Sequence, residues 1–489
     1  MAKLTKLQDT WKRGAKQDIP RTQMPEGSAW SLVDYIPDLD APLRKRGGWA
    51  YSSSSLSAVS ASTASATYVF HVRYAPFVAA AKLCVFDEDG RLYTVNTSTN
   101  AVTDIGAAVT PLQTAFHGDK LIIPASGGAT GVKYYDGSTL GALSASAPCA
   151  KYTTVYRDRT LLANTNAQPR YVYFSGAGDP TSWDTTNGWL QVGAPVTGLA
   201  ALPGALMVFQ DVRTSRIRGF TPPPDSDMQV DDPLFEIGCT DARSIAVTAG
   251  FVVFANPEGV YSSNGTNLPT DLTALVGLKR LWQTTMSGYD ASTWTIAGGF
   301  YRTNYIVTVM NAGTFKDCFV FDLANFRCWR ASNMTAACFN GATQISEELW
   351  FGLRDETKLA KASPMWAPAA AYKNDGDGTA VAPVLESALY GADPPGLKTW
   401  RHVYLEYEMT DAATDNPVLT VSHLKNPSDS YTALSTTLAE TGRTRKRLGL
   451  RFPSDGLAFK IAQTNASANT FIHALEADVH GREQSRIAQ

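Results

Sequence analysis

The sequence predicts an all-β protein, and three observations lead to this fold class. Short apolar runs separated by turn residues follow one another from Tyr68 to about Trp366. Helical periodicity is nearly absent, and residues 272–282 form the one convincing helical segment. Charged residues make up 18% of the chain, below the usual ~25%, and Ser, Thr, Ala, Gly and aromatic residues take their place. This balance is typical of strand-and-turn proteins and excludes collagen, coiled coils and disordered chains.

The apolar runs indicate individual strands. Asp89-Gly90 separates two of them and predicts a hairpin with a type I′ turn, which needs positive φ at both central residues. The uncharged stretch Thr185–Gln210 is interrupted by glycines and prolines, so we interpret it as strand, turn and strand rather than as a membrane span. The clearest runs are Tyr68–Tyr74, Leu83–Phe86, Arg91–Val95, Tyr171–Ser175, Ala205–Gln210, Phe251–Phe254, Tyr305–Met310, Cys318–Leu323 and Leu349–Leu353.

A weak internal repeat organises these strands. A turn glycine, an aromatic residue on the next strand and a turn Asp or Asn recur at Gly90–Asn96, Gly131–Gly137 and Gly259–Gly265. The spacing fits a period of ~40–45 residues, the length of one four-stranded propeller blade. The sequence therefore predicts a β-propeller of about seven blades, since blades that stack in a closed ring protect their edges. Chance recurrence of Gly-x-x-Tyr in a turn-rich chain is the alternative.

Composition divides the chain into three regions. Residues 1–66 are predicted to form an extended N-terminal arm and linker laid against other elements, with Ser52–Ala66 a flexible or edge segment. Residues 67–370 are predicted to form the propeller. After the loop Lys373–Gly378, strands such as Arg401–Met409 alternate apolar and polar residues. Residues 371–489 are therefore predicted to form an antiparallel β-sandwich.

The charge balance and the cysteines exclude several classes of protein. Lys and Arg number 43 and Asp and Glu 45, so no global basic excess points to nucleic acid. No apolar leader occurs within residues 1–18, and we expect a soluble protein without a secretory signal. The six cysteines have no C-x-x-C spacing and are expected to be reduced and mostly buried.

No catalytic motif is found. The sequence contains no G-x-S-x-G, H-E-x-x-H or P-loop pattern, and its six histidines are scattered. We therefore expect a protein that is not an enzyme, with no catalytic residue, no cofactor and no metal site. Asp375-Gly-Asp377-Gly resembles half of a calcium loop but lacks further acidic ligands, so a linker turn is the favoured interpretation. Ion binding at Asp375 and Asp377 stays open.

Two groups of basic residues are candidate contacts for a protein partner or for DNA in a channel. On a strand, Arg443, Arg445, Arg447 and Arg451 would share one face and form a positive surface. A solvated edge strand that is kept charged to prevent pairing is the alternative. The candidate contact residues are Lys12, Arg13, Arg44, Lys45, Arg46, Arg443, Arg445, Lys446, Arg447 and Arg451.

Several segments resemble one known family. Gly178–Trp183 resembles the GDPTSW stretch of bacteriophage tail β-propeller proteins, the nozzle or hub subunits of short-tailed phages. The resemblance covers most of residues 20–480, and none of its motifs is catalytic. The chain has Asp241-Ala-Arg where the family pattern has Ala-Pro-Arg, so no role is inferred there. The other similar segments are Arg44–Gly48, Leu206–Asp211, Ile217–Phe220, Ile237–Ser244, Gly250–Phe254, Gly259–Tyr261, Arg447–Phe459 and Ile472–Val479.

The resemblance implies a virion structural protein of the phage tail, made in the cytoplasm of the host bacterium. Its copies would form a homo-oligomeric ring on the tail axis that continues or seals the DNA channel and docks the adaptor or portal and other tail proteins or fibres. No membrane contact is implied. A tail-tip or receptor-binding propeller is the alternative, in which aromatic residues of Tyr171–Trp183 would stack on cell-surface glycan. A propeller enzyme that cleaves polysaccharide is a third alternative.

Overall fold

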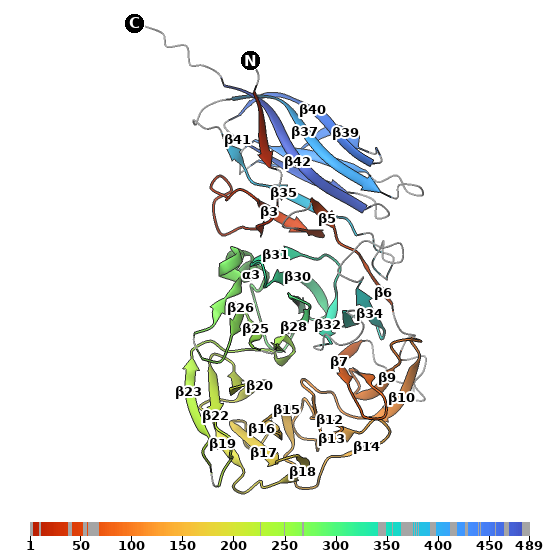
Figure 1. Ribbon diagram of the computed structural model, residues 1–489, viewed down its shortest axis with the longest axis vertical. Coiled ribbons are helices and arrows are strands. Elements are labelled where there is room, and N and C mark those ends of the chain that lie inside the picture. The colour runs from red at the N-terminus through yellow and green to blue at the C-terminus, as the bar shows by residue number, and fades with distance from the viewer. Residues whose placement is uncertain are drawn as a thin grey trace.

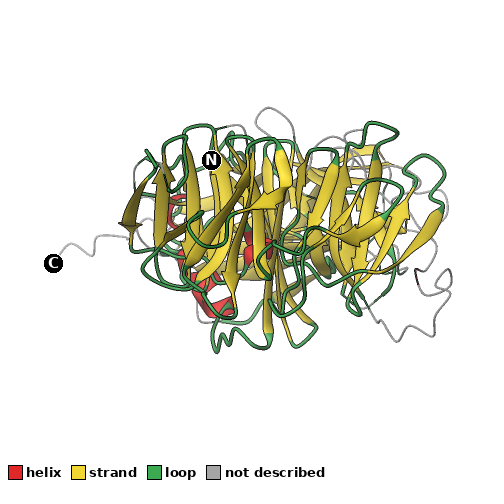
Figure 2. Ribbon diagram, turned by 90° about the horizontal axis from the view of Figure 1, so that it is seen from below, coloured by secondary structure: helices red, strands yellow, loops and turns green. Residues whose placement is uncertain are grey.

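A ring of small sheets lies at one end of the molecule, and a β-sandwich lies at the other (Figure 1). The computed structural model describes residues 3–8, 11–37, 42–51, 56, 68–224, 226–248, 250–266, 268–340, 349–354, 356–362, 375, 377, 379, 381–391, 398–410, 418–425, 429–438, 440, 442–454, 456–463 and 469–481. Strands run across the thickness of the ring when it is seen from below (Figure 2). The predicted all-β propeller architecture is confirmed.

Five antiparallel sheets follow one another along the chain from β7 to β27. The first contains β7 (Val69–Ala75), β8 (Lys82–Asp87), β9 (Arg91–Val95) and β10 (Val102–Ala107), and the second β11 (Ala115–His117), β12 (Lys120–Ile123), β13 (Lys133–Tyr135) and β14 (Leu140–Ala142). The third contains β15 (Ala150–Tyr156), β16 (Arg159–Thr165), β17 (Tyr171–Gly176), β18 (Asp179–Trp183) and β19 (Trp189–Gln191). The fourth contains β20 (Val196–Leu202), β21 (Ala205–Gln210), β22 (Thr214–Arg218) and β23 (Gln229–Phe235), and the fifth β24 (Ala246–Val247), β25 (Val252–Asn256), β26 (Gly259–Ser263) and β27 (Thr270–Asp271).

The sixth separate sheet is completed by a strand from the N-terminal region. β32 (Ala336–Phe339), β33 (Trp350–Leu353) and β34 (Leu359–Ala362) are followed outward by β6 (Trp49–Tyr51), which pairs antiparallel with β34. The end of the ring is therefore tied to the chain's beginning, and the edge of β34 is covered.

Four further strands fill the place in the ring between β27 and β32. They are β28 (Trp294–Tyr301), β29 (Asn304–Asn311), β30 (Thr314–Asp322) and β31 (Arg327–Arg330). This set is not a separate sheet, because β31 pairs in parallel with β3 (Ser28–Val33) of the sandwich. Six sheets thus stand alone as blades, against about seven predicted, and β28–β31 form the unit that joins the ring to the sandwich.

The sandwich combines C-terminal strands with strands of residues 1–45. One sheet contains β1 (Lys3–Gln8), β4 (Tyr35–Ile36), β5 (Leu43–Lys45), β37 (Lys398–Thr410), β40 (Gly442–Ser454) and β42 (Asn469–Gly481). The other continues from β3 and contains β2 (Gly14–Ala15), β35 (Val384–Ser387), β36 (Tyr390–Gly391), β38 (Leu419–Leu424), β39 (Thr432–Leu438) and β41 (Gly456–Gln463). The segment expected to be an extended arm is therefore built into both the sandwich and the ring. Most of Ser52–Ala66 lies outside the described residues.

The core of the sandwich follows the predicted alternation. Val403, Leu405, Tyr407 and Met409 of β37 are all buried, and their sequence neighbours are more exposed. One buried apolar cluster extends from these residues into β28–β31, where it includes Phe319. The sandwich and this part of the ring therefore share a core.

Two local predictions need correction. The single helix expected over residues 272–282 is two short helices, α2 (Leu272–Val276) and α3 (Lys279–Thr285). Gly277 ends α2 in the left-handed region at φ +76°, which breaks the helical path. The hairpin at Asp89-Gly90 is present, but positive φ there is confined to Gly90. Because the Gly90 N–H donates to Asp87 O at 3.2 Å, residues 87–90 form a four-residue turn, and the predicted type I′ turn is wrong.

The repeat and the uncharged stretch agree with their predictions. Tyr93, Tyr134 and Tyr261 each lie on the third strand of a sheet, β9, β13 and β26. Thr185–Gln210 forms β19, β20 and β21 rather than one span. Among the described residues, no helix has the length and apolar character needed to cross a membrane. All six cysteines are free, and each except the partly exposed Cys149 is buried.

Candidate functional site

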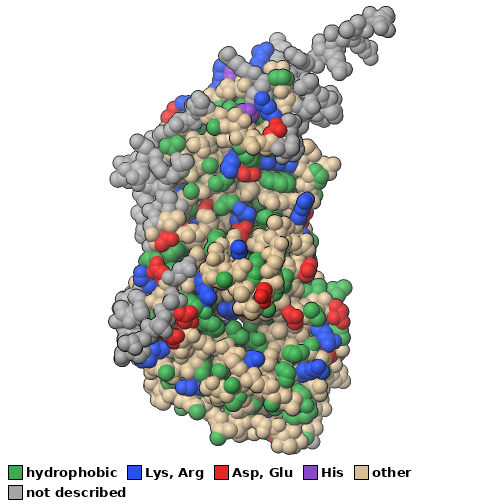
Figure 3. All heavy atoms as spheres, turned by 180° about the vertical axis from the view of Figure 1, so that it is seen from behind, with side chains coloured by type: hydrophobic (Ala, Val, Ile, Leu, Met, Phe, Trp, Pro, Cys, Tyr) green, Lys and Arg blue, Asp and Glu red, His purple; other side chains and the backbone are tan. Residues whose placement is uncertain are grey.

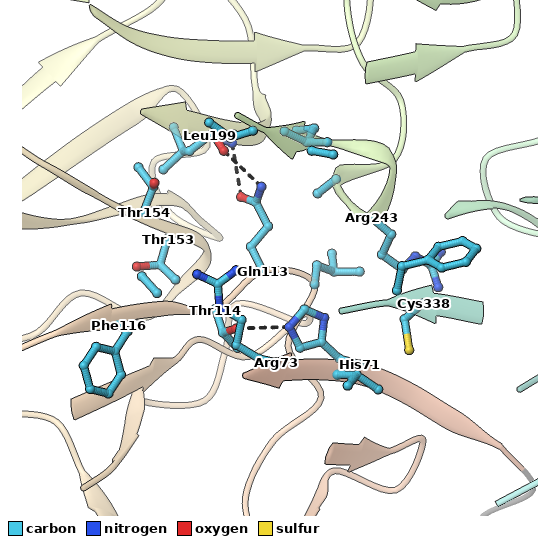
Figure 4. Close-up of a pocket in the computed structure, with 18 of the residues that line it drawn as sticks. His71, Arg73, Gln113, Thr114, Phe116, Thr153, Thr154, Leu199, Arg243 and Cys338 are labelled. Carbon is cyan, nitrogen blue, oxygen red and sulfur yellow. Dashed lines mark hydrogen bonds between the residues drawn. The ribbon is translucent and has the colours of Figure 1, made fainter. Parts of the chain in front are cut away.

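A cavity of about 360 Å³ lies at the centre of the ring, where the first strands of the sheets converge (Figure 4). Its lining comes from β7, β11, β15, β20, β24, β28 and β32, and from the short 3-10 helix η1 (Ala242–Ser244). No Asp or Glu is among the lining residues. The polar lining side chains are His71, Arg73, Gln113, Thr114, Thr153, Thr154 and Arg243.

β7 supplies both a histidine and an arginine to this cavity. His71 and Arg73 are two residues apart, so their side chains leave the same face of the strand. His71 Nε2 lies 3.0 Å from the hydroxyl oxygen of Thr114. Burial, together with the positive charges of Arg73 and Arg243, lowers the pKa of His71 to about 3. His71 is therefore neutral at physiological pH.

Gln113 links the segment before β11 to β20 across the cavity. Its Nε2 donates to Leu199 O at 3.0 Å, and its Oε1 accepts from Leu199 N at 3.1 Å (Figure 4). Both ends of the amide are engaged in these bonds. Gln113 therefore holds two sheets at a fixed separation.

The two arginines of the cavity differ in their partners. Arg243 donates to both oxygens of Asp241, from Nε at 3.0 Å and from Nη2 at 2.8 Å. Asp241 Oδ2 also accepts the Ile296 N–H at 3.1 Å. The side chain of Arg73 makes no hydrogen bond or ion pair with any residue that the structure describes, and its Nε is buried without a partner. The charge of Arg243 is therefore compensated within the protein, and the charge of Arg73 is not.

The basic residues predicted near the N-terminus fall into different environments. Lys12 and Arg13 are exposed between β1 and β2, where they are accessible to a partner. Arg44 is half-buried and lines a second cavity of about 330 Å³ between the sandwich and β28–β31. Lys45 and Arg46 are buried. Their predicted role as surface contacts for DNA or a partner is wrong, because neither side chain reaches the surface.

Arg46 instead binds Asp375, one of the two acidic residues in the segment that resembles a calcium loop. Its Nη1 and Nη2 each donate to one oxygen of Asp375 at 3.0 Å, and Nη2 also donates to Ser332 O at 2.7 Å. Asp377 accepts from Asn333 Nδ2 at 3.0 Å. The guanidinium thus occupies the place that a cation would need at Asp375. No cluster of three or more metal-ligating residues occurs in the described part of the chain.

The C-terminal basic run lies on an edge strand. β40 pairs with β37 on one side and is the last strand of its sheet. Arg443, Arg445 and Arg447 are exposed on one face, as the alternation predicts. Arg443 and Arg445 pair with Glu406 and Glu476, and Lys446 pairs with Glu440. The side chain of Arg451 lies outside the described part.

Charges on the ring do not gather into one basic surface on the face seen in Figure 3. Lys and Arg side chains are interspersed there with Asp and Glu.

In the second cavity, Arg327 pairs with Asp322 at 2.7 Å, so the charge of Arg327 is compensated. β40 therefore carries the densest group of exposed basic residues that the sequence predicted.

The aromatic residues of the third sheet form a partly exposed stack. The rings of Tyr171 and Trp189 lie 4.0 Å apart, with 12° between their planes. Trp183 Nε1 donates to Pro180 O at 2.8 Å, which closes the turn of the Gly178–Trp183 segment. Trp183 therefore has a structural role, and Tyr171 and Trp189 offer the flat surface that could contact a sugar.

The central cavity was not predicted from the sequence. Its residues come from separate sheets, and no local motif connects them. One signal is visible afterwards: Arg73 interrupts the apolar run Tyr68–Tyr74 on the strand that begins the first sheet. A charged residue within such a run requires solvent, an opposite charge of the protein or a ligand.

Comparisons with known proteins do not define a family for this chain. No protein-family model matches the chain, and no curated protein matches it. The chain is similar to the WD40 β-propeller domain of Doa1, with 10% identity, a TM-score of 0.39, and coverage of 65% of this chain and 97% of that one. It is also similar to BamB from Moraxella catarrhalis, with 11% identity, a TM-score of 0.36, and coverage of 68% of this chain and 96% of that one. For YCF48 from Cyanidioschyzon merolae the identity is 10%, the TM-score is 0.39, and the coverage is 62% of this chain and 97% of that one.

Proposed function

We propose that this chain is a structural subunit of a bacteriophage tail. In this proposal its copies form a ring on the tail axis, as a nozzle or hub, that continues or seals the DNA channel and docks other tail components. The sequence resemblance, spread over residues 20–480, is the first support. The observation that carries the proposal is the stiff connection between the ring and the sandwich.

That connection consists of a sheet, a shared core and a buried ion cluster. The sheet passes from β31 to β3 through the pair Val33 and Arg330. Beside this pair, Arg46 binds Asp34 and Asp375, which come from distant parts of the chain. Both side chains of each ion pair are fully buried. A buried, fully hydrogen-bonded cluster resists hinge motion, because separating its charges inside the protein is unfavourable. Such a block suits a part that bears mechanical load.

Contacts between neighbouring copies are proposed at the exposed basic residues. β40 pairs on one side alone among the strands that the structure describes, and Arg447 on it is exposed. Lys12 and Arg13 are exposed between β1 and β2. Edge strands and charge complementarity are common means of binding an extended or acidic segment of a partner.

The experiment is a nonsense mutation of the gene in a phage that encodes this chain. We expect particles made without the protein to leak packaged DNA or to lack the distal tail, as seen by electron microscopy. Supplying the wild-type chain in trans should restore infectivity, which controls for polar effects. Mass spectrometry of purified virions should find the chain in several copies. Filled, infectious particles without the protein would contradict the proposal.

A receptor-binding role at the tail tip is the second candidate. The stacked pair Tyr171 and Trp189 favours it, since partly exposed aromatic faces bind sugar rings. A glycan array with purified protein separates the two roles. Binding that is lost in Trp189→Ala would support the tip, and its absence together with an axial ring in particle images would support the nozzle.

A further inference from the structure

We propose that the central cavity of the ring is a binding site for a small oxyanion, held by the guanidinium of Arg73. This inference goes beyond the proposed function, because a structural subunit of a tail needs no ligand inside its propeller. It depends on the charge of the cavity, the donors on its wall and its size.

The charge of the cavity is positive and incompletely compensated. The lining contains Arg73 and Arg243 and no carboxylate. Arg243 is neutralised by Asp241, to which its Nε and Nη2 donate. Arg73 has no such partner among the described residues, and its Nε is buried without a hydrogen bond. An anion in the cavity would pair with this guanidinium, whose charge no carboxylate of the lining compensates.

The wall around Arg73 offers donors suited to an oxyanion. The Arg73 side chain points from β7 into the cavity (Figure 4). A guanidinium presents parallel N–H groups that match two oxygens of a phosphate or carboxylate. The Thr154 hydroxyl lines the same cavity and has no partner in the described part of the structure. His71 Nε2 and the Thr114 hydroxyl share one hydrogen bond; when Thr114 donates in it, the other ring nitrogen of neutral His71 carries the proton and is a further donor.

The size of the cavity limits the class of ligand. A volume of about 360 Å³ accommodates phosphate with water, or a small organic phosphate or carboxylate. The lining also contains apolar side chains, among them Leu199, Ala246 and Phe339. A cavity that combines apolar side chains with a few convergent polar groups is typical of small-molecule sites. We therefore assign the site to small oxyanions rather than to a polymer.

The test measures thermal unfolding of the full chain against increasing inorganic phosphate, with sodium chloride at equal ionic strength as the reference. We expect a saturable rise in the unfolding temperature, since a ligand that binds only the folded state stabilises it. Arg73→Gln should abolish this rise. Arg170→Gln removes the same charge from an exposed position of the ring and should leave the rise unchanged.

Two further measurements make the result decisive. Calorimetric titration with phosphate should give one site per chain in the wild type and in Arg170→Gln, and no site in Arg73→Gln. Citrate in a parallel titration distinguishes a phosphate from a carboxylate ligand. If Arg73→Gln does not fold, Arg73→Lys replaces it, because lysine keeps the positive charge but lacks the two parallel N–H groups of a guanidinium. We expect this variant to bind phosphate at least tenfold more weakly than the wild type. Equal stabilisation of the wild type and Arg73→Gln by phosphate, or no effect of phosphate or citrate on the wild type, would overturn the proposal.

Discussion

The guanidinium of Arg46 and the carboxylate of Asp34 form a fully buried ion pair, with Arg46 Nε 2.5 Å from Asp34 Oδ1. Ser332 N–H also donates to Asp34 Oδ1 at 2.9 Å. Ser332 follows β31, so the end of the β28–β31 unit contacts the same carboxylate. Asp375 completes the cluster from the segment that leads into the sandwich. Burial raises the pKa of Asp375 even though Arg46 opposes this shift. Three distant segments thus meet at one guanidinium.

Arg46→Met should destabilise the protein strongly. The substitution leaves the carboxylates of Asp34 and Asp375 buried without their cation, and breaking one side of a buried ion pair costs about 3–5 kcal/mol. Urea unfolding gives the free energy of unfolding. Arg170→Met, at an exposed position, should change it by less than about 0.5 kcal/mol. Equal effects of the two substitutions would show that the cluster does not stabilise the fold.

Asp317 should make stability depend on pH between about 4 and 6. Burial raises the pKa of Asp317 to about 6, and this outweighs the attraction of Arg330, whose Nη1 lies 3.2 Å away. Because the folded pKa exceeds the unfolded value of 3.8, protonated Asp317 stabilises the fold. The contribution, at most about 3 kcal/mol, is complete below pH 3.8 and is lost as the pH rises through 6.

The measurement compares wild type with Asp317→Asn by urea unfolding at several pH values from 4 to 7.5. Groups common to both proteins cancel in the difference. The wild type should gain stability relative to the variant as the pH falls. A difference that stays constant over this range would contradict the prediction.

Removing Arg73 should raise the pKa of His71. The wild-type value of about 3 reflects burial first and then the charges of Arg73 and Arg243. Arg73→Gln removes one of the two charges. Since the folded pKa lies below the unfolded 6.5, neutral His71 stabilises the fold above pH 6.5, and this contribution is lost as the pH falls toward 3. In the variant the loss should be complete at a higher pH.

This pKa is measured by NMR of the histidine rings in phosphate-free buffer. His71→Gln assigns the resonance of His71 by its disappearance. Arg170→Gln serves as the charge control and should leave the titration of His71 where it is in the wild type. Identical titrations of His71 in the wild type and in Arg73→Gln would refute the electrostatic account of the cavity.

Gly352→Ala should weaken closure of the ring. A Cβ at Gly352 on β33 would lie 2.4 Å from Val69 Cγ1 on β7 and 2.8 Å from Cys338 Sγ, closer than real contacts allow. Such overpacking typically costs 1–3 kcal/mol, so we expect a loss of roughly 2 kcal/mol in the free energy of unfolding. Gly204→Ala is the matched control, because a Cβ there meets no atom within 4 Å. A Gly352→Ala protein as stable as this control would indicate that the first and last sheets are loosely packed.

Charge reversal on the edge strand should affect assembly more than folding. Arg443 is 61% exposed and Arg445 is 48% exposed, and such ion pairs contribute at most about 1 kcal/mol each. Arg443→Glu with Arg445→Glu should therefore lower the free energy of unfolding by no more than about 2 kcal/mol. If β40 lies at the proposed subunit contact, native mass spectrometry should show fewer rings. Unchanged assembly would place the contact elsewhere.

Local sequence signals predicted the fold because strands and turns have short periods. The alternation in β37 placed Val403 and Leu405 in the core, and the recurring Tyr93, Tyr134 and Tyr261 marked the third strand of three sheets. The helical character of residues 272–282 was predicted, but the break at Gly277 was not, because hydrophobic periodicity does not show that a residue adopts the left-handed conformation. The two-residue period of a strand also predicted that Arg443, Arg445 and Arg447 of β40 share one exposed face.

The sequence by itself determined an all-β chain with a turn-rich repeat and an alternating C-terminal region. Only the tertiary structure decided which charges are buried and which strands complete which sheets. Arg46 binds Asp375 although 329 residues separate them. β6 comes from the N-terminal region and pairs with β34, which lies in the last sheet of the ring. The energy of a charged side chain depends on the atoms that surround it after folding, and no local pattern records those atoms.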